Sequence, residues 1–289
     1  MRNMIEIGDT IGLIACSNGL PIESNKKIKQ LEEILVSLGL KFVYGNEIYR
    51  SKDVYNGTPK EKAEGLMKLF KDKSVKAIFD ISGGDLANGV LNYLDFNEIA
   101  INKKPFFGYS DLSVLLNPLH DLSGIDTYYY QLRNLVGEYK EEQLKLFKCF
   151  FFEGSSDLLN FNYKWIRGKK MSGEVVGGNI RCFLKLAGTK YMGDFKDKIL
   201  FLESLGGDVS KITTYLTQYE QLGVFKNVKG IILGSFSEME EKNYTPKTEE
   251  ILLDILGDLD LPIIKTNELG HGQNSKSIAI GKKIKFMRE

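Results

Sequence analysis

Short apolar runs alternate with segments of helical spacing through the first half of the chain, and this alternation constrains the fold most. The predicted strands cover residues 10–16, 41–44, 75–81 and 104–109, and the predicted helices cover 25–38, 58–70, a segment through 91–94, and 111–122. Parallel strands need a crossover of about a dozen residues, usually a helix, so this order predicts parallel βαβ units. Ligand sites in such sheets lie beyond the carboxyl ends of the strands, which here are the loops at 16–19, 82–85 and 109–111.

The second half has a different pattern and predicts a second domain. Its predicted helices cover 141–151, 177–186, 210–222 and 248–256, and its predicted strands cover 198–203, 230–235 and 262–266. Segments 160–165 and 173–176, joined by a turn at 167–170, are typical of a β-hairpin. We therefore predict an α/β protein with a doubly wound, mostly parallel N-terminal sheet domain (1–153), a linker (154–167) and a mixed α/β C-terminal domain (168–289).

Charge and hydropathy argue against several classes of protein. Among the 289 residues, 39 Lys and Arg offset 38 Asp and Glu, and the net charge of +1 does not favour binding to nucleic acid or to an anionic membrane. No apolar run approaches the roughly 18 residues that span a bilayer. The first residues lack the apolar core and cleavage site of a signal peptide, so we expect a cytoplasmic protein.

The cysteines argue against a disulfide framework and against a zinc cluster. Cys16, Cys149 and Cys182 are odd in number, far apart and without a C-x-x-C pair. We expect each of them to be a small buried hydrophobic residue. The spacing predicts no metal site.

The two histidines limit the choice of a general base at neutral pH. His120 lies ten positions after Ser110 on a predicted helix, roughly 15 Å along its axis, so its side chain should not reach Ser110. His271 follows a predicted strand and stands between two glycines, which allow a close approach of the backbone to another element. An ordinary glycine-rich turn remains the alternative for His271.

Ser110 is the candidate nucleophile, because a serine at a strand-to-helix turn presents its hydroxyl at the carboxyl edge of the sheet. The amides of the following helix can stabilise an oxyanion there. The alternative is a simple helix cap, since Ser is a favoured N-cap residue. Glu203 ends an apolar strand and can orient an imidazole. A solvated strand end is its alternative, and Asp208 and Asp111 compete for the same role.

A glycine pair within Ser82-Gly83-Gly84-Asp85 follows another predicted strand and could expose an amide to a ligand oxygen. The spacing gives neither G-x-G-x-x-G nor G-K-[ST], so a dinucleotide or Walker-type phosphate site is poorly supported. A tight turn is the alternative. The tyrosines at 128–130 favour a buried strand over a stacking platform.

Taken together, these motifs resemble the L,D-carboxypeptidase family of serine peptidases, which includes murein tetrapeptide carboxypeptidases and microcin C self-immunity proteins. The resemblance extends from about residue 8 to about residue 285. It rests on the order and spacing of Gly8-Asp9-Thr10-Ile11, Ser82-Gly83-Gly84-Asp85, Gly108-Tyr109-Ser110-Asp111, Gly177-Gly178-Asn179, Leu202-Glu203, Leu216-Thr217-Gln218 and Gly270-His271-Gly272.

The resemblance implies a Ser-His-Glu triad of Ser110, His271 and Glu203, with the active site at the interface of the two domains. It implies an oxyanion hole formed by the amides of Gly84 and Asp111. Family members hydrolyse the bond that releases a C-terminal D-residue from an L-centre in murein peptides, and the immunity branch cleaves an amide between a peptide and a nucleotide-like group. Neither a metal nor an organic cofactor is implied, and the family likeness implies a homodimer.

The chain departs from the family pattern around the substrate. Ser82 stands where many members have Arg before the glycine pair, and this brings the sequence closer to the immunity branch. Gln131-Leu132-Arg133 follows the tyrosines where many members have Gly-Pro, and Arg133 is a candidate replacement for binding a carboxylate. Ser82, Gly83, Asp85 and Arg133 are therefore the predicted substrate-binding residues. A catalytically silent peptide-binding protein remains the reading from a different functional class.

Overall fold

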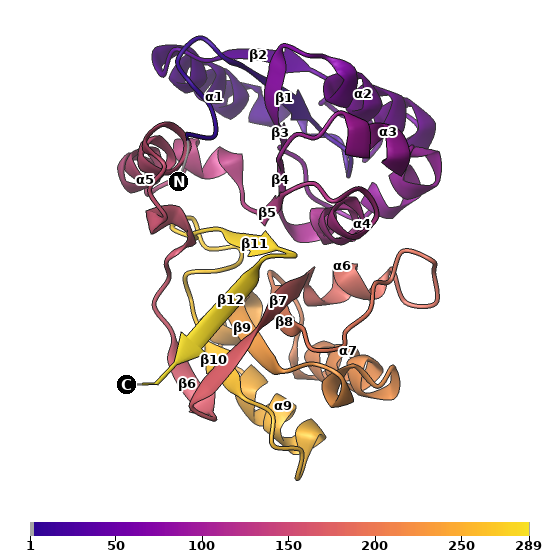
Figure 1. Ribbon diagram of the computed structural model, residues 1–289, viewed down its shortest axis with the longest axis vertical. Helices are drawn as coiled ribbons and strands as arrows, with labels where there is room; N and C mark the ends of the chain where they lie inside the picture. The colour runs from indigo at the N-terminus through magenta and orange to yellow at the C-terminus, as the bar shows by residue number, and fades with distance from the viewer. Residues whose placement is uncertain (1–2, 289) are drawn as a thin grey trace.

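The computed structural model describes residues 3–288 and contains a first six-stranded sheet in the order β11-β5-β4-β3-β1-β2 (Figure 1). The N-terminal half supplies five of these strands, and β11 (Ile278–Ile280) comes from the C-terminal half. The parallel strands of this sheet are β1 (Thr10–Ile14), β2 (Lys41–Tyr44), β3 (Val75–Asp80), β4 (Phe106–Gly108) and β5 (Thr127–Tyr129). The chain moves from β1 outward to β2 and then back past β1 to β3. The strand order therefore reverses beside β1, as in doubly wound folds.

Helices cover both faces of this sheet, with α1 and α5 on one side and α2, α3 and α4 on the other (Figure 1). Their bounds are α1 (Asn25–Ser37), α2 (Pro59–Lys71), α3 (Phe96–Ile101), α4 (Ser113–Ser123) and α5 (Lys140–Glu153). Neighbouring residues of β1 pack into different hydrophobic clusters, since Leu13 joins α1 and α5 whereas Ile14 joins α2 and α4. Strands buried on both faces explain the nearly continuous apolar runs of the sequence.

Short 3-10 helices fill several connections of the N-terminal half. They are η1 (Ile22–Ser24), η2 (Ala87–Tyr93), η3 (Ser110–Leu112), η4 (Leu132–Val136) and η5 (Asp157–Leu159). The helix predicted through 91–94 is thus the 3-10 helix η2, and α3 after it was not predicted. Asn88, Gly89 and Asn92 are poor formers of an α-helix, which explains the difference.

A second six-stranded sheet, ordered β12-β7-β8-β9-β10-β6, forms most of the C-terminal half. Its strands are β6 (Lys164–Arg167), β7 (Lys170–Asn179), β8 (Ile199–Ser204), β9 (Gly230–Phe236), β10 (Ile263–Lys265) and β12 (Lys283–Met287). Strands β7 to β10 are parallel, and β12 and β6 are antiparallel edges. The helical segments are α6 (Ile180–Leu184), α7 (Val209–Gln221), η6 (Val224–Lys226), α8 (Ser237–Glu241) and α9 (Thr248–Leu256). The predicted α/β class is confirmed, and both sheets are mixed and mostly parallel.

The predicted β-hairpin of 160–176 is wrong, although most of its second half is a strand. Strand β6 pairs with β10, and β7 pairs with β8 on one side and with β12 on the other. Because both edges of β7 are occupied, β6 has no place beside it. The two strands follow one another across a turn at Gly168 without pairing.

Strand β11 (Ile278–Ile280) was not predicted and joins the sheet of the other half. It pairs antiparallel with β5, so a segment of the predicted C-terminal domain completes the N-terminal sheet. A second link joins α4 to β7, where the Asn117 amide donates to the Gly177 carbonyl at 2.9 Å and accepts from the Gly177 N–H at 3.0 Å. These links bring the carboxyl ends of β4, β7 and β8 to one place. Within residues 3–288, no helix is long and apolar enough to cross a membrane.

Candidate active site

Ser110 lies directly after β4, where the chain turns sharply into η3. Its backbone has a φ of 56°, a left-handed conformation that is uncommon for a residue with a Cβ. Such a conformation costs roughly 1–3 kcal/mol and persists only where the surroundings enforce it. Here the Ser110 N–H donates a hydrogen bond to the Tyr129 hydroxyl at 2.8 Å, and Ser113 Oγ donates to the Ser110 carbonyl at 2.7 Å. The turn is therefore fixed on both sides.

His271 and Glu203 approach this turn from the other sheet. His271 Nε2 lies 2.9 Å from Ser110 Oγ, and His271 Nδ1 lies 2.6 Å from Glu203 Oε2. Glu203 is in β8 and has no exposed surface, and the His271 side chain is 6% exposed. The structure thus brings together three side chains that are up to 161 positions apart, in the order hydroxyl, imidazole, carboxylate. This order matches the geometry expected of a nucleophile, a base and a group that orients the base.

Two glycines allow the approach. Gly270 has a φ of 131°, and a Cβ there would lie 2.2 Å from Ser235 Oγ and 2.9 Å from Glu203 Oε2. Gly178 has a φ of 140°, and a Cβ there would lie 2.2 Å from Ser113 Oγ. A side chain at Gly178 would push β7 away from α4, and a side chain at Gly270 would displace the His271 segment from β8 and β9. The motifs at 177–179 and 270–272 therefore have a steric reason to contain glycine.

Glu203 has two further hydrogen-bond donors that sequence reasoning missed. The Tyr129 hydroxyl donates to Glu203 Oε1 at 2.6 Å, and Asn179 Nδ2 donates to the same oxygen at 2.9 Å. Burial, and after it the Glu203 charge, hold the pKa of Tyr129 well above its usual value, so the hydroxyl keeps its proton. Asn179 belongs to a motif that the sequence had singled out, whereas Tyr129 was predicted only as part of a buried strand.

The acidic competitors of Glu203 have other partners. The Asp111 carboxylate is fully buried and accepts from Ser17 Oγ at 2.6 Å, from the Ala87 N–H at 2.9 Å and from Lys185 Nζ at 2.5 Å. Asp208 caps α7 by accepting from the Lys211 N–H at 3.0 Å. Neither carboxylate hydrogen-bonds to His271, so neither fills the role that was left open for it.

The turn at 82–85 was predicted to contact a substrate, but several of its polar groups bond to the protein itself. Ser82 has no exposed surface, its hydroxyl donates to Asp80 Oδ1 at 2.5 Å, and it accepts from the Ser17 N–H at 3.0 Å. The Ser82 side chain therefore supports the turn, and its buried hydroxyl already has two hydrogen-bond partners. The Gly83 carbonyl accepts from the Asn18 N–H at 3.2 Å.

Asp85 is half exposed and forms ion pairs with Arg181 and with Lys185. Its partial burial opposes ionisation, but these two cations, Arg181 first, hold the pKa of Asp85 below its usual value. Asp85 thus links the N-terminal turn to the start of the C-terminal domain. Its charge is already neutralised without a substrate.

The ring of Tyr109 lies between Arg133 and the cluster of Ser110, His271 and Glu203. Its Nη2 donates to the Tyr109 hydroxyl at 2.9 Å, and its guanidinium lies over the Tyr109 ring at 6.0 Å from the centroid. The Tyr109 ring is 5.2 Å from the His271 ring. Arg133 Nε is buried and has no hydrogen-bond partner among the described residues. The guanidinium therefore has unused donor capacity beside the site.

The other residues with potential chemistry lie elsewhere or are inert. His120 is on α4, and its Nδ1 is 2.9 Å from the Ile125 carbonyl oxygen, so it is not part of the cluster. Cys16 and Cys182 are buried as expected, but Cys149 is partly exposed at the end of α5. Within residues 3–288, no group of three or more His, Cys, Asp or Glu side chains is placed to hold a metal ion.

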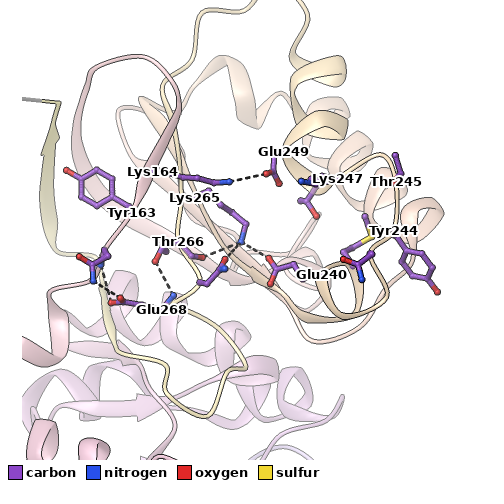
Figure 2. A pocket seen from close by; sticks show the side chains of 15 residues that line it. Tyr163, Lys164, Glu240, Tyr244, Thr245, Lys247, Glu249, Lys265, Thr266 and Glu268 are labelled. Carbon is purple, nitrogen blue, oxygen red and sulfur yellow. Dashed lines mark hydrogen bonds and ion pairs between the residues drawn. The ribbon is translucent and has the colours of Figure 1, made fainter.

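A cavity of about 770 Å³ lies at the carboxyl ends of β9 and β10 (Figure 2), and Ser110 is not among the residues that line it. Its lining mixes three lysines with three glutamates, and none of the three clustered side chains contributes to it. Lys265 points into it with Nζ bonded to Glu240 at 2.6 Å and to Asn267 at 2.8 Å (Figure 2). Since the cationic and anionic groups offset one another, this cavity shows no preference for a charged ligand.

Comparison with known proteins identifies relatives along the whole chain. The profile of the LD-carboxypeptidase N-terminal domain matches residues 11–130, and that of the LD-carboxypeptidase C-terminal domain matches residues 172–286. The microcin C7 self-immunity protein MccF of Escherichia coli is 24% identical over 97% of this chain and 91% of its own. The murein tetrapeptide carboxypeptidase of Pseudomonas aeruginosa is 23% identical over 84% of this chain and 83% of its own.

Solved structures of similar proteins share the fold of this chain. A structure of MccF superposes with a TM-score of 0.87 at 23% identity, covering 97% of this chain and 93% of that one. A MccF-like protein from Bacillus anthracis superposes with a TM-score of 0.82 at 26% identity, covering 99% and 95%. With both domain profiles matched in order and the resemblance of the sequence motifs confirmed, this chain belongs to the LD-carboxypeptidase family.

Proposed function

We propose that this protein is a serine-type LD-carboxypeptidase that hydrolyses the bond between an L-centre and a C-terminal D-residue in murein-type peptides. The observation that supports this most is the pair of contacts from His271 to Ser110 (2.9 Å) and to Glu203 (2.6 Å). Membership of the family supplies the reaction class, and the guanidinium of Arg133, whose Nε is unpaired, supplies a reason for carboxypeptidase specificity.

In the first half of the proposed reaction, Ser110 Oγ attacks the carbonyl carbon while His271 Nε2 takes the hydroxyl proton. Glu203 holds Nδ1 and stabilises the positive imidazolium. The tetrahedral intermediate then collapses, the carbon–nitrogen bond breaks, and the imidazolium gives its proton to the leaving amine. The D-amino acid departs, and the remaining peptide is an ester of Ser110.

In the second half, water attacks the ester and His271 takes its proton. Collapse of this intermediate returns the proton to Ser110 Oγ and releases the shortened peptide as a carboxylic acid. The proposed oxyanion donors are the backbone N–H groups of Gly84 and Asp111. Neither N–H donates to a protein acceptor within residues 3–288. Such preorganised donors stabilise the negative oxygen in a site that excludes water.

Arg133 is the proposed binder of the substrate's terminal carboxylate. A guanidinium can pair with a carboxylate through two parallel hydrogen bonds, which gives both energy and direction. Tyr109 accepts a hydrogen bond from Arg133 Nη2, and Arg133 Nε has no partner among the described residues. We propose this contact in place of the substrate role predicted for Ser82, because the Ser82 hydroxyl is already fully bonded.

The test is direct. The purified protein is incubated with a murein tetrapeptide that ends in D-Ala, and release of free D-Ala is followed over time. The same peptide with a C-terminal L-Ala is the matched control and should not be cleaved. Absence of D-Ala release with folded protein would contradict the proposed substrate.

A second candidate is an immunity-type hydrolase that cleaves the amide between a peptide and a nucleotide-like group. It is favoured by Ser82 in place of the arginine common in the family and by the high TM-score to MccF, whose solved complexes include aspartyl sulfamoyl adenosine and glutamyl sulfamoyl guanosine. A peptidyl-aminoacyl nucleotide analogue in the same assay separates the two candidates. If the protein hydrolyses neither compound, the remaining candidate is a catalytically silent peptide-binding homologue. Equilibrium binding of both compounds would test that candidate.

The family likeness also leads us to propose a cytoplasmic homodimer that acts on peptides recycled from the cell wall. Light scattering on the purified protein at several concentrations measures the mass directly. A mass of 32.7 kDa at all concentrations would contradict the dimer.

A further inference from the structure

The three side chains are closed into a ring of hydrogen bonds by a fourth, Tyr129. Its hydroxyl lies 2.8 Å from the Ser110 backbone nitrogen and 2.6 Å from Glu203 Oε1. Glu203 continues to His271, and His271 continues to Ser110 Oγ. Tyr129 belongs to β5 of the N-terminal sheet and Glu203 to β8 of the other, so the ring crosses the interface between the sheets.

The direction of each bond in the ring follows from the chemistry. A backbone N–H can only donate, so the Tyr129 oxygen accepts from Ser110. A phenol has a single proton, which must therefore go to Glu203 Oε1. Asn179 Nδ2 donates to the same oxygen at 2.9 Å, and Oε2 is left for His271. Tyr129 is 2% exposed, so water does not replace these bonds.

We propose that Tyr129 is a positioning residue that holds the nucleophile turn and the carboxylate of the triad in register across the two sheets. Through the Ser110 N–H it fixes the left-handed turn that aims Oγ, and through Glu203 it fixes the carboxylate that orients His271. It also occupies the Ser110 N–H, which removes that amide from the oxyanion hole and leaves the task to Gly84 and Asp111. The proposal rests on the proposed triad but not on a particular substrate.

A second consequence concerns the charge of Glu203. Two neutral donors on Oε1 spread its negative charge and weaken its pull on the proton at His271 Nδ1. Without the Tyr129 hydroxyl, the carboxylate attracts the imidazolium more strongly, so the bond from Glu203 Oε2 to His271 Nδ1 holds the proton more tightly. The other titratable or charged groups nearby are Cys182, which faces Tyr129, and Tyr109 with Arg133 beside the imidazole.

The experiment compares Tyr129→Phe with the matched control Tyr130→Phe. The Tyr130 hydroxyl is buried next along the chain but has no hydrogen-bond partner among the described residues. The readout is the rate at which a fluorophosphonate phosphonylates Ser110, with fluoride as the leaving group, measured from pH 5 to pH 9 by mass spectrometry. This readout needs no peptide substrate, so failure of the proposed substrate and failure of this inference are distinguishable.

We expect Tyr129→Phe to slow labelling about ten- to a hundredfold, the loss expected for hydrogen bonds to a charged group. The acid limb of its pH profile should move to higher pH. With the peptide substrate, kcat should fall by a similar factor and KM should change less than about twofold. Tyr130→Phe should match the wild type. Labelling of folded Tyr129→Phe within twofold of the wild type, with an unmoved acid limb, would overturn the proposal.

A fluorotyrosine-labelled form of the same chain tests the proposal if Tyr129→Phe does not fold. Replacing all 14 tyrosines by 3-fluorotyrosine keeps every hydroxyl and makes each a stronger donor. The acid limb should then move to lower pH, opposite to the effect of Tyr129→Phe. The same substitution in the Tyr130→Phe background should give the same shift, and an unmoved limb would contradict the role of Tyr129.

Discussion

At the scale of single residues, Ser110 combines an unusual backbone with a short contact to an imidazole. The left-handed φ of 56° directs Oγ toward His271 at 2.9 Å. Ser110 is not a simple helix cap, the alternative that the sequence had left open, because the cap positions of η3 and α4 are Tyr109 and Leu112 and no side chain caps either helix. Its predicted role as nucleophile remains a proposal with a clear test.

Ser110→Ala should abolish hydrolysis and preserve the fold. Removing the hydroxyl takes away the attacking atom, and we expect kcat to fall by roughly four orders of magnitude or more. Among the described residues the Ser110 hydroxyl bonds to His271 alone, so the free energy of unfolding should change by about 1 kcal/mol. Steady-state kinetics and urea unfolding measure the two effects. Near-normal turnover by the folded variant would refute the assignment.

Arg133→Ala should raise KM for a peptide with a free C-terminal carboxylate by about ten- to a hundredfold, since a charged hydrogen-bonded contact is lost. Lysine should not rescue it, because an ammonium cannot form the two parallel bonds of a guanidinium. The same peptide with a C-terminal amide is the control. If the variant loses the same factor on both peptides, Arg133 does not read the carboxylate.

At the scale of elements, the site depends on how closely β7 approaches α4. The Asn179 N–H donates to Ser113 Oγ at 2.8 Å, and Ser113 Oγ donates to the carbonyl of Ser110. Gly178 lies against this same oxygen and has no room for a Cβ. The end of β7 is therefore connected to the nucleophile turn through a single hydroxyl.

Gly178→Ala should cost about 2–4 kcal/mol of stability, because the φ of 140° is strained for alanine and the new Cβ displaces Ser113. It should also lower kcat, since the Ser113 bond to Ser110 is lost. Gly206→Ala is the matched control: its φ is ordinary and a Cβ would meet nothing closer than Glu238 at 3.4 Å. Thermal unfolding and kinetics of the two variants check this prediction. Equal unfolding temperatures and equal kcat values for Gly178→Ala and Gly206→Ala would contradict it.

At the scale of the whole molecule, neither half of the chain is complete. The N-terminal half lacks Glu203 and His271, and its sheet lacks the edge strand β11. Residues 1–153 expressed alone should therefore show no hydrolysis and should unfold at a lower temperature than the full chain. Circular dichroism and the D-Ala assay measure both properties. A fragment as stable as the full protein would show that β11 contributes little.

The sequence by itself predicted the local structure because local structure depends on near neighbours. Strand β2 and helix α9 have the bounds that periodicity predicted, and the other strands of the parallel βαβ units differ by a few residues. The loop at the carboxyl end of β4 contains Ser110, which a general rule for α/β sheets had indicated, and Glu203 lies at the carboxyl end of β8. His271 could be proposed as the general base because the chain has only two histidines.

Only the tertiary structure decided which distant segments meet. The pairing of β6 with β10, the addition of β11 to the other sheet, and the bond from Tyr129 to Glu203 join residues 74 or more positions apart. No local period encodes such contacts, because they depend on the packing of both sheets at once. Ser82 shows the same limit: its position in a loop predicted a ligand contact, and only its neighbours Asp80 and Ser17 show that its hydroxyl is already used. The sequence determined the elements and the chemical groups available, and the packing of the two sheets decided which of those groups face one another.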